Sequence, residues 1–106
     1  MANVKTFRDL VVWQKGMELS RRVYRETAKM PASERYGLTD QMRRSSHSVP
    51  ANIAEGFGRE TRKDLVRFLR QARGSLYELD TQVELAKSLD MIKPSEMMLG
   101  LIRETD

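Results

Sequence analysis

Apolar residues recur at three- and four-residue intervals along most of the chain, which is the period of an α-helix with one buried face. Three of these segments are long and cover about residues 10–29, 38–57 and 61–89. A shorter segment covers about 94–104, where Pro94 suits the first turn of a helix. We find no alternation of apolar and polar residues of the kind that marks a half-buried strand. The pattern therefore predicts an all-α fold.

Prolines and glycines mark the ends of the predicted helices. Pro31 ends the first one, because the residue before a proline is pushed out of the helical region. Pro50 lies inside the second segment and removes one backbone hydrogen bond, so we expect a kinked but continuous helix there. Gly56 and Gly58 are expected to end this helix and to allow a tight reversal of the chain. Thr61 is the expected N-cap of the third helix.

Helices with one apolar face and short connections pack as bundles, so residues 1–106 are predicted to form one antiparallel up-and-down four-helix bundle. The fourth helix is short or incomplete, and about ten residues cannot cover a third helix roughly 40 Å long. Apolar surface would then stay uncovered within one chain. We therefore expect a homo-oligomer that covers it.

The apolar faces identify the candidate core. The face of the first helix comprises Val12, Trp13, Gly16, Met17, Ser20, Val23, Tyr24 and Thr27. That of the second comprises Leu38, Met42, Ser45, Val49, Ile53 and Gly56. The clearest face, on the third, comprises Leu65, Phe68, Leu69, Ala72, Leu76, Leu79, Val83 and Ala86.

Composition argues against most kinds of catalysis. The chain has no cysteine and a single histidine, so disulfides, thiolate nucleophiles and histidine-rich metal sites are not expected. Ser46, His47 and Ser48 are adjacent, which on a helix points them in different directions and disfavours a serine nucleophile with His47 as its base. We expect no catalytic residue, cofactor, metal or membrane span. The missing apolar leader also suggests a cytoplasmic protein.

Charge is unevenly distributed along the chain. The net charge is +4, yet residues 1–73 hold 16 basic and 8 acidic side chains, whereas 74–106 hold 3 and 7. Opposite the apolar face of the third helix, one arc gathers six cations, which are Arg59, Arg62, Lys63, Arg67, Arg70 and Arg73. Such a ridge suits the phosphates of a nucleic acid, because each cation releases condensed counterions. The alternative is a solvated face whose basic half meets the acidic half of a neighbour.

A second polar cluster lies in the second segment. Gln41, Ser45 and Asn52 lie beside its apolar face, and Asn52 or Ser46 could satisfy backbone groups freed by Pro50. A buried polar seam between helices is therefore favoured over a ligand site.

Several separated motifs resemble one known family. They are Phe7-Arg8-Asp9-Leu10-Val11-Val12-Trp13-Gln14, Gln41-Met42-Arg43-Arg44, Ser48-Val49-Pro50-Ala51-Asn52-Ile53-Ala54-Glu55-Gly56 and Ala72-Arg73-Gly74-Ser75-Leu76-Tyr77-Glu78-Leu79. In this order they resemble the bacterial four-helix-bundle proteins encoded in intervening sequences of 23S ribosomal RNA genes. The similarity runs from about residue 7 to 92. It extends to the accessory proteins of diversity-generating retroelements, which are basic pentamers that work with RNA.

The resemblance implies a ring-like homopentamer without an established enzymatic activity. By that analogy the basic ridge, together with Arg43, Arg44 and Arg59, would face nucleic acid, RNA being favoured over DNA. The family's most recognisable motif holds Asn52, Glu55 and Gly56 close after Pro50, and structural roles account for them: Glu55 pairs with an arginine and Gly56 ends a helix. We therefore expect a non-enzymatic oligomeric bundle that binds nucleic acid. The alternative is a scaffold whose charges serve self-association or a protein partner.

Overall fold

The computed structural model describes residues 4–92 of the 106-residue chain. Its helices are η1 (Phe7–Asp9), α1 (Val11–Thr27), η2 (Ala32–Glu34), α2 (Leu38–Phe57) and α3 (Arg62–Ser88), the two η elements being single 3₁₀ turns. No strand occurs in this part of the chain, which confirms the all-α prediction. The three long helices begin and end within two residues of their predicted bounds. The fourth helix, expected at 94–104, lies outside the described residues.

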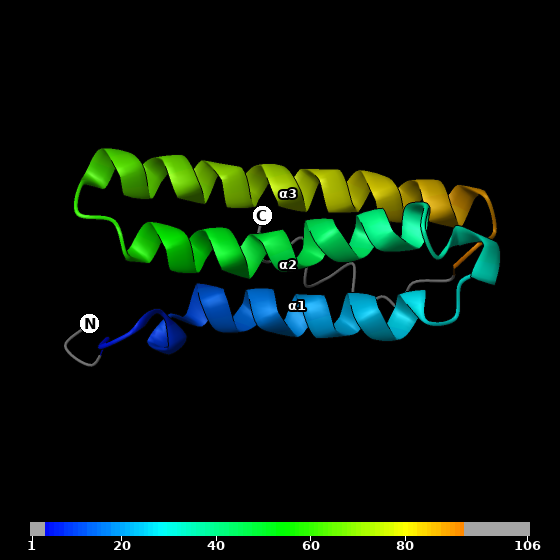
Figure 1. The fold of residues 1–106 in the computed structure, drawn as a ribbon, viewed down its shortest axis with the longest axis horizontal. Coiled ribbons are helices and arrows are strands. Elements are labelled where there is room, and N and C mark those ends of the chain that lie inside the picture. The colour runs from blue at the N-terminus through cyan, green and yellow to red at the C-terminus, as the bar shows by residue number, and fades with distance from the viewer. Residues whose placement is uncertain (1–3, 93–106) are drawn as a thin grey trace.

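The three long helices lie side by side with α2 in the middle, and successive helices run in opposite directions (Figure 1). Both α1 and α3 pack against α2, whereas no Cα atom of α1 comes within 8 Å of one in α3. The resulting body is elongated, at 45 × 21 × 19 Å. The two outer helices therefore each have one helical neighbour within the described part.

The core forms where the apolar faces of the three helices converge. Leu19, Val23, Met42, Leu79 and Val83 are fully buried there. The sequence pattern had omitted Leu19, although its spacing from Gly16 and Val23 fits the same face. It was wrong about three residues at the edges of the faces, since Val12, Tyr24 and Leu69 are exposed by 42%, 43% and 40%. The reason is that, among the long helices of residues 4–92, α1 and α3 each pack against α2 but not against each other.

Pro50 lies inside α2 without dividing the helix in two, so the prediction of a continuous helix is confirmed. Its ring is buried against α1 at Gly16, where an added Cβ atom would lie 3.3 Å from the Cβ of Pro50. The side chains of Ser46 and Asn52 bond other backbone oxygens than the one Pro50 frees, since Ser46 Oγ donates to Arg43 O and Asn52 Nδ2 to Ser48 O. The expectation that one of them satisfies the freed carbonyl of Ser46 was therefore wrong.

A reciprocal capping box starts the folded region ahead of α1, and the sequence pattern did not indicate it. Thr6 Oγ1 accepts from the backbone N–H of Arg8, while Asp9 Oδ2 accepts from those of Lys5 at 2.8 Å and Thr6 at 3.1 Å. These two backbone donors hold the pKa of Asp9 below its ordinary value, because they stabilise the carboxylate. The short helix η1 thus depends on a charged side chain.

Acid is therefore expected to loosen this segment. Because the pKa of Asp9 is lower in the folded chain than in the unfolded one, its contribution is present above its ordinary pKa and is lost as the pH falls through the lowered value. We expect the amide resonances of Lys5 and Thr6 to move toward random-coil shifts in this acidic range. NMR titration of the native chain checks this, and Asp9→Asn should show no such transition. An unchanged transition in the variant would contradict the assignment.

Candidate nucleic-acid interface

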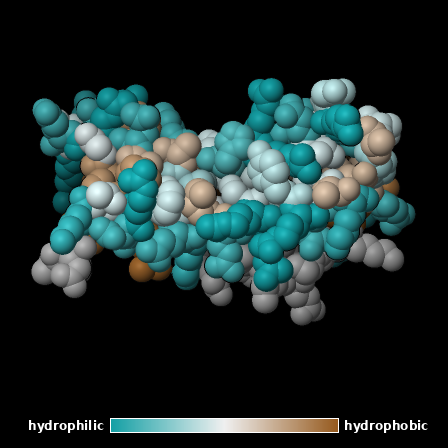
Figure 2. All heavy atoms as spheres, turned by 60° about the horizontal axis from the view of Figure 1, so that its bottom comes forward, coloured by the Kyte–Doolittle hydropathy of each residue, from teal (hydrophilic) through white to brown (hydrophobic). Residues whose placement is uncertain are grey.

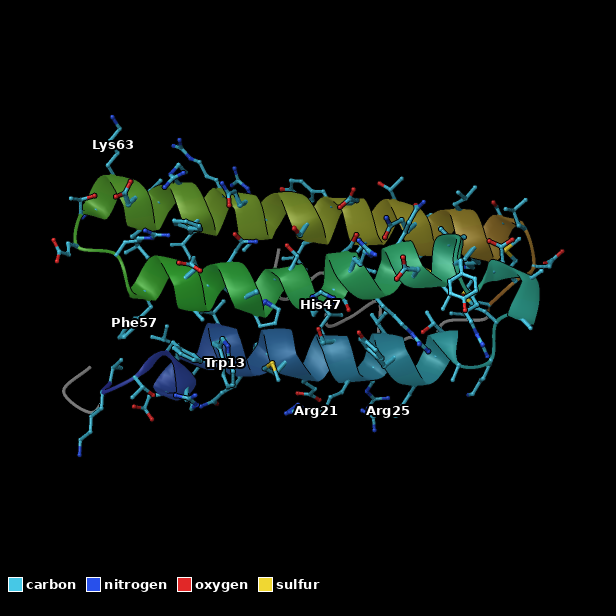
Figure 3. All side chains as sticks on the ribbon, viewed as in Figure 1. Trp13, Arg21, Arg25, His47, Phe57 and Lys63 are labelled. Carbon is cyan, nitrogen blue, oxygen red and sulfur yellow. The ribbon has the colours of Figure 1, made fainter. Side chains whose placement is uncertain are left out.

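The five ridge cations within α3 are all solvent-exposed, as the sequence predicted; they are Arg62, Lys63, Arg67, Arg70 and Arg73. The helix begins where Thr61 Oγ1 accepts from the N–H of Asp64 at 3.2 Å, which confirms Thr61 as the N-cap. Lys63 projects from the side of α3 that faces away from α2 (Figure 3). The first half of α3 therefore presents positive charge to solvent.

Ion pairs divide these cations into two groups. Arg67 lies 3.7 Å from Asp64, one turn earlier on the same helix. Within residues 4–92, the other four make no ion pair and no hydrogen bond through their side chains; they are Arg62, Lys63, Arg70 and Arg73. These four, called the open cations below, have their full charge available to an external anion.

Arg59 does not belong to the surface of α3, because it precedes the helix in the α2–α3 turn. It donates to Glu55 at 2.8 Å, and its guanidinium carbon lies 4.7 Å from the ring centroid of Phe68. The guanidinium of Arg67 lies over the same ring at the same distance. Arg59 thus links the end of α2 to α3 by an ion pair and a cation–π contact. The prediction that Arg59 belongs to the ridge is therefore corrected, because Arg59 has a structural role in the α2–α3 turn.

Arg43 and Arg44 lie far along α2 from the open cations. Arg43 donates to Thr27 Oγ1 at 2.9 Å and stacks 4.7 Å from the ring centroid of Tyr24, so it joins α2 to α1. Arg44 pairs with Asp40 at 3.0 Å. Because α2 and α3 are antiparallel, their neighbour Ser45 meets Glu78 in the acidic half of α3. The structure therefore does not bring these two arginines to the ridge.

The other basic surface lies on the opposite side of the molecule. Arg21 and Arg25 project from the side of α1 that faces away from α2 (Figure 3). Both are exposed. They are therefore separated from the ridge by the width of the three-helix layer.

An apolar groove of about 280 Å³ borders the ridge. Residues from all three long helices line it, among them Val12, Ile53, Val66, Leu69, Arg70 and Arg73. It lies toward the end where α2 turns into α3, and hydrophobic side chains also gather toward that end on the face shown in Figure 2. Arg70 and Arg73, two of the open cations, thus lie beside an apolar surface.

The polar seam predicted in the middle of the chain lies between α2 and α3. Ser45 Oγ donates to Glu78 Oε1 at 3.1 Å, and the hydroxyls of Ser48 and Ser75 are 2.9 Å apart. Asn52 Nδ2 donates to Ser48, which ties the amide to its own helix. These groups bond one another, so the structural interpretation of the seam is supported.

Two other residues of the family motif have structural roles, one of them different from the prediction. Glu55 pairs with Arg59, as expected. Gly56 is buried within α2, and a Cβ added there would lie 2.9 Å from the Cβ of Phe68. No glycine in the described residues has a positive φ angle, so neither Gly56 nor Gly58 provides an unusual backbone turn. Gly56 is needed for the close approach of α3.

The serines beside His47 are engaged elsewhere. Ser46 Oγ is buried and donates to the backbone of Arg43, whereas Ser48 bonds Ser75. His47 is exposed and makes no hydrogen bond within residues 4–92. The same part of the chain holds no group of three or more side chains arranged to bind a metal. Its helices include none with the length and apolarity to cross a membrane.

A comparison with protein families matches residues 8–104 to the model described as 23S rRNA-intervening sequence protein. The chain belongs to this family. The match spans α1, α2 and α3, so it includes both the ridge and the polar seam. No curated protein matches the chain. Membership bears out the resemblance of the sequence motifs, while assembly into a pentamer stays a prediction.

Proposed function

We propose that this member of the 23S rRNA-intervening sequence protein family binds nucleic acid without acting as an enzyme, RNA being favoured over DNA. The observation that supports it most is the set of open cations, which have no acidic partner in residues 4–92. Charges already neutralised within the chain would gain little from a phosphate. Unpaired ones release counterions from the nucleic acid when they bind it.

The spacing of the open cations suits a phosphate backbone. Arg62 and Arg73 are separated by three helical turns, or roughly 16 Å along the axis at 1.5 Å per residue. A duplex carries one negative charge per roughly 1.7 Å of its axis, so several phosphates face such a ridge at once. Three of the four cations are arginines, whose guanidinium binds phosphate oxygens in a bidentate manner. The surface has no pattern of amides for reading base edges, which favours binding by charge and shape.

Fluorescence anisotropy with a labelled RNA stem-loop at low salt tests the proposal. The variant Arg62→Gln/Arg70→Gln/Arg73→Gln keeps side-chain length and helix propensity while it removes three charges. We expect its affinity for the RNA to be at least about tenfold lower than that of the native chain, since three phosphate contacts are lost. Circular dichroism checks that the helices remain.

The matched control is Arg21→Gln/Arg25→Gln, which removes exposed arginines from the opposite side of the molecule. This variant should lose less than half as much binding free energy as the triple variant. Equal losses in both would mean that net charge alone attracts the RNA. Absence of binding by the native chain at about 50 mM salt would overturn the proposal, because electrostatic binding is strong there. The scaffold alternative would then be favoured.

A further inference from the structure

A polar pocket lies at the end of the α2–α3 seam, where the second half of α3 runs beside the start of α2 (Figure 1). Its volume is about 340 Å³, and every lining residue is polar: Gln41, Arg44, Ser45, Ser48, Glu78 and Gln82. At roughly 100° per residue, Gln82 lies about 100° or more around α3 from each of the open cations. The pocket is therefore separate from the ridge, and it shares no lining residue with the apolar groove.

The amide oxygen of Gln82 is buried and accepts no hydrogen bond from any residue between 4 and 92. Buried polar atoms are nearly always bonded, because losing the hydrogen bonds of water without replacement costs free energy. Gln41 also lines the pocket, from α2, yet its side-chain amide makes no hydrogen bond in the same part of the chain. Gln82 Oε1 thus offers an acceptor to a donor that enters the pocket.

Glu78 adds a negatively charged acceptor one turn before Gln82. Its Oε1 accepts from Ser45 Oγ at 3.1 Å, and the carboxylate makes no ion pair within the described residues. Arg44, the cation among the lining residues, is already paired with Asp40 at 3.0 Å. The lining therefore keeps the negative charge of Glu78, which favours a positively charged donor over a neutral one.

The arrangement of the acceptors indicates the kind of cation. Glu78 and Gln82 come from α3 and the hydroxyl of Ser45 from α2, so the oxygens lie on two sides of the pocket. An ammonium group has three N–H donors around one compact nitrogen, whereas the five donors of a guanidinium lie in one plane. Calcium is less suited, since its sites gather many oxygens and often several carboxylates, and residues 4–92 hold no acidic cluster placed to bind a metal. The oxygens therefore suit an ammonium group best.

We propose that this pocket binds a primary alkylammonium group, whose N–H donors are accepted by Gln82 Oε1, the Glu78 carboxylate and Ser45 Oγ. The same group occurs in aliphatic polyamines and on the lysine side chains of proteins, and both would bind through these contacts. None of the open cations takes part, so the site does not depend on RNA binding.

NMR titration of the native chain with n-butylammonium chloride tests the pocket. The side-chain amide resonances of Gln82 are expected to shift and to saturate. Potassium chloride at the same concentrations supplies the charge without an N–H donor, and it should move these resonances at least about fivefold less. Equal shifts with the two salts would overturn the proposal, as would the absence of a saturable shift up to about 100 mM butylammonium.

Two further ligands distinguish the sources of the ammonium group. Spermidine represents a polyamine, and Nα-acetyl-lysine amide represents the side chain of a partner protein. A preference of about tenfold or more for spermidine would assign the site to polyamines. Comparable affinities would assign it to a lysine side chain.

Variants of the two acceptors separate the pocket from general attraction to charge. Gln82→Leu deletes the amide and should weaken butylammonium binding at least about tenfold, as followed through the backbone amide of Ser45. Glu78→Gln keeps the shape of the side chain without its charge and should weaken binding severalfold. The control Gln71→Leu changes an exposed glutamine of α3 outside the lining and should bind like the native chain. Equal weakening in Gln71→Leu and Gln82→Leu would contradict the site.

Urea unfolding shows whether Gln82 has only a structural role. Because its Oε1 has no partner in residues 4–92, Gln82→Leu should leave the midpoint of unfolding unchanged or raise it. Circular dichroism of every variant confirms that helix content is kept. If Gln82→Leu binds butylammonium as tightly as the native chain, the proposal is wrong whatever the stability of the variant.

Discussion

Replacing Gly56 by alanine is expected to lower the free energy of unfolding by up to about 2 kcal/mol, because overpacking costs about 1–3 kcal/mol before the helix propensity of alanine is counted. The new Cβ would lie 2.9 Å from the Cβ of Phe68 and 3.3 Å from a methyl carbon of Leu65, both on α3. The Cβ of Phe68 is tied to the backbone, so α3 must move as a whole. Alanine favours a helix interior over glycine by about 1 kcal/mol, which only partly offsets the loss. Urea denaturation followed by circular dichroism measures the change.

Gly58, two residues later, provides the matched control for this prediction. A Cβ added there would meet nothing closer than 3.6 Å, and the φ angle of Gly58 is −81°, which any residue adopts. Gly58→Ala is therefore expected to stay within about 0.5 kcal/mol of the native chain. If both glycines served to free the backbone for a turn, both variants would lose stability alike. Similar losses at the two positions would refute the packing explanation.

The same pair of glycines illustrates what a sequence conveys about this fold. The two glycines predicted the end of α2 correctly to within one residue, because the sequence signals that end a helix are local. The reason for Gly56 was not local, since it depends on Phe68, which is twelve residues away and on another helix. Periodicity likewise gave the three long helices. It misplaced Val12 and Leu69, since the exposure of a face edge depends on which neighbour covers it.

The sequence predicted correctly which cations of the candidate site are exposed to solvent, but it did not predict which arginines contact other residues of the chain. The charge pattern correctly predicted that Arg62, Arg70 and Arg73 lie on an outer surface, because a cation opposite the apolar face of a helix is directed to solvent. It could not foresee that Arg43 reaches Thr27 or that Arg59 stacks on Phe68. Long side chains find partners on neighbouring helices, and helix register decides which ones. An aromatic ring or a hydroxyl on a neighbouring helix can indicate that an arginine has a partner within the chain. This can be recognised only when it is known which helices pack together and in which register.

RNA affinity is expected to fall steeply with salt. With four open cations each meeting a phosphate, the logarithm of the binding constant should decrease with a slope of about −3 to −4 against the logarithm of salt concentration. This corresponds to a loss of roughly 60- to 250-fold between 50 and 200 mM salt. Anisotropy titrations at four or more salt concentrations measure the slope. The physical reason is that added salt reduces the entropy gained when condensed counterions leave the RNA.

The slope of the logarithm of the binding constant against that of salt concentration reports the number of phosphate contacts, which a single affinity does not. The variant Arg62→Gln/Arg70→Gln/Arg73→Gln retains Lys63 as its one open cation, so its slope should shrink by about 3, to near −1. The control Arg21→Gln/Arg25→Gln should keep the native slope even if its overall charge weakens binding somewhat, because a distant charge alters the field without displacing a counterion from the contact. Parallel slopes for the native chain and the triple variant would place the phosphates elsewhere. In that case the bound RNA does not follow α3.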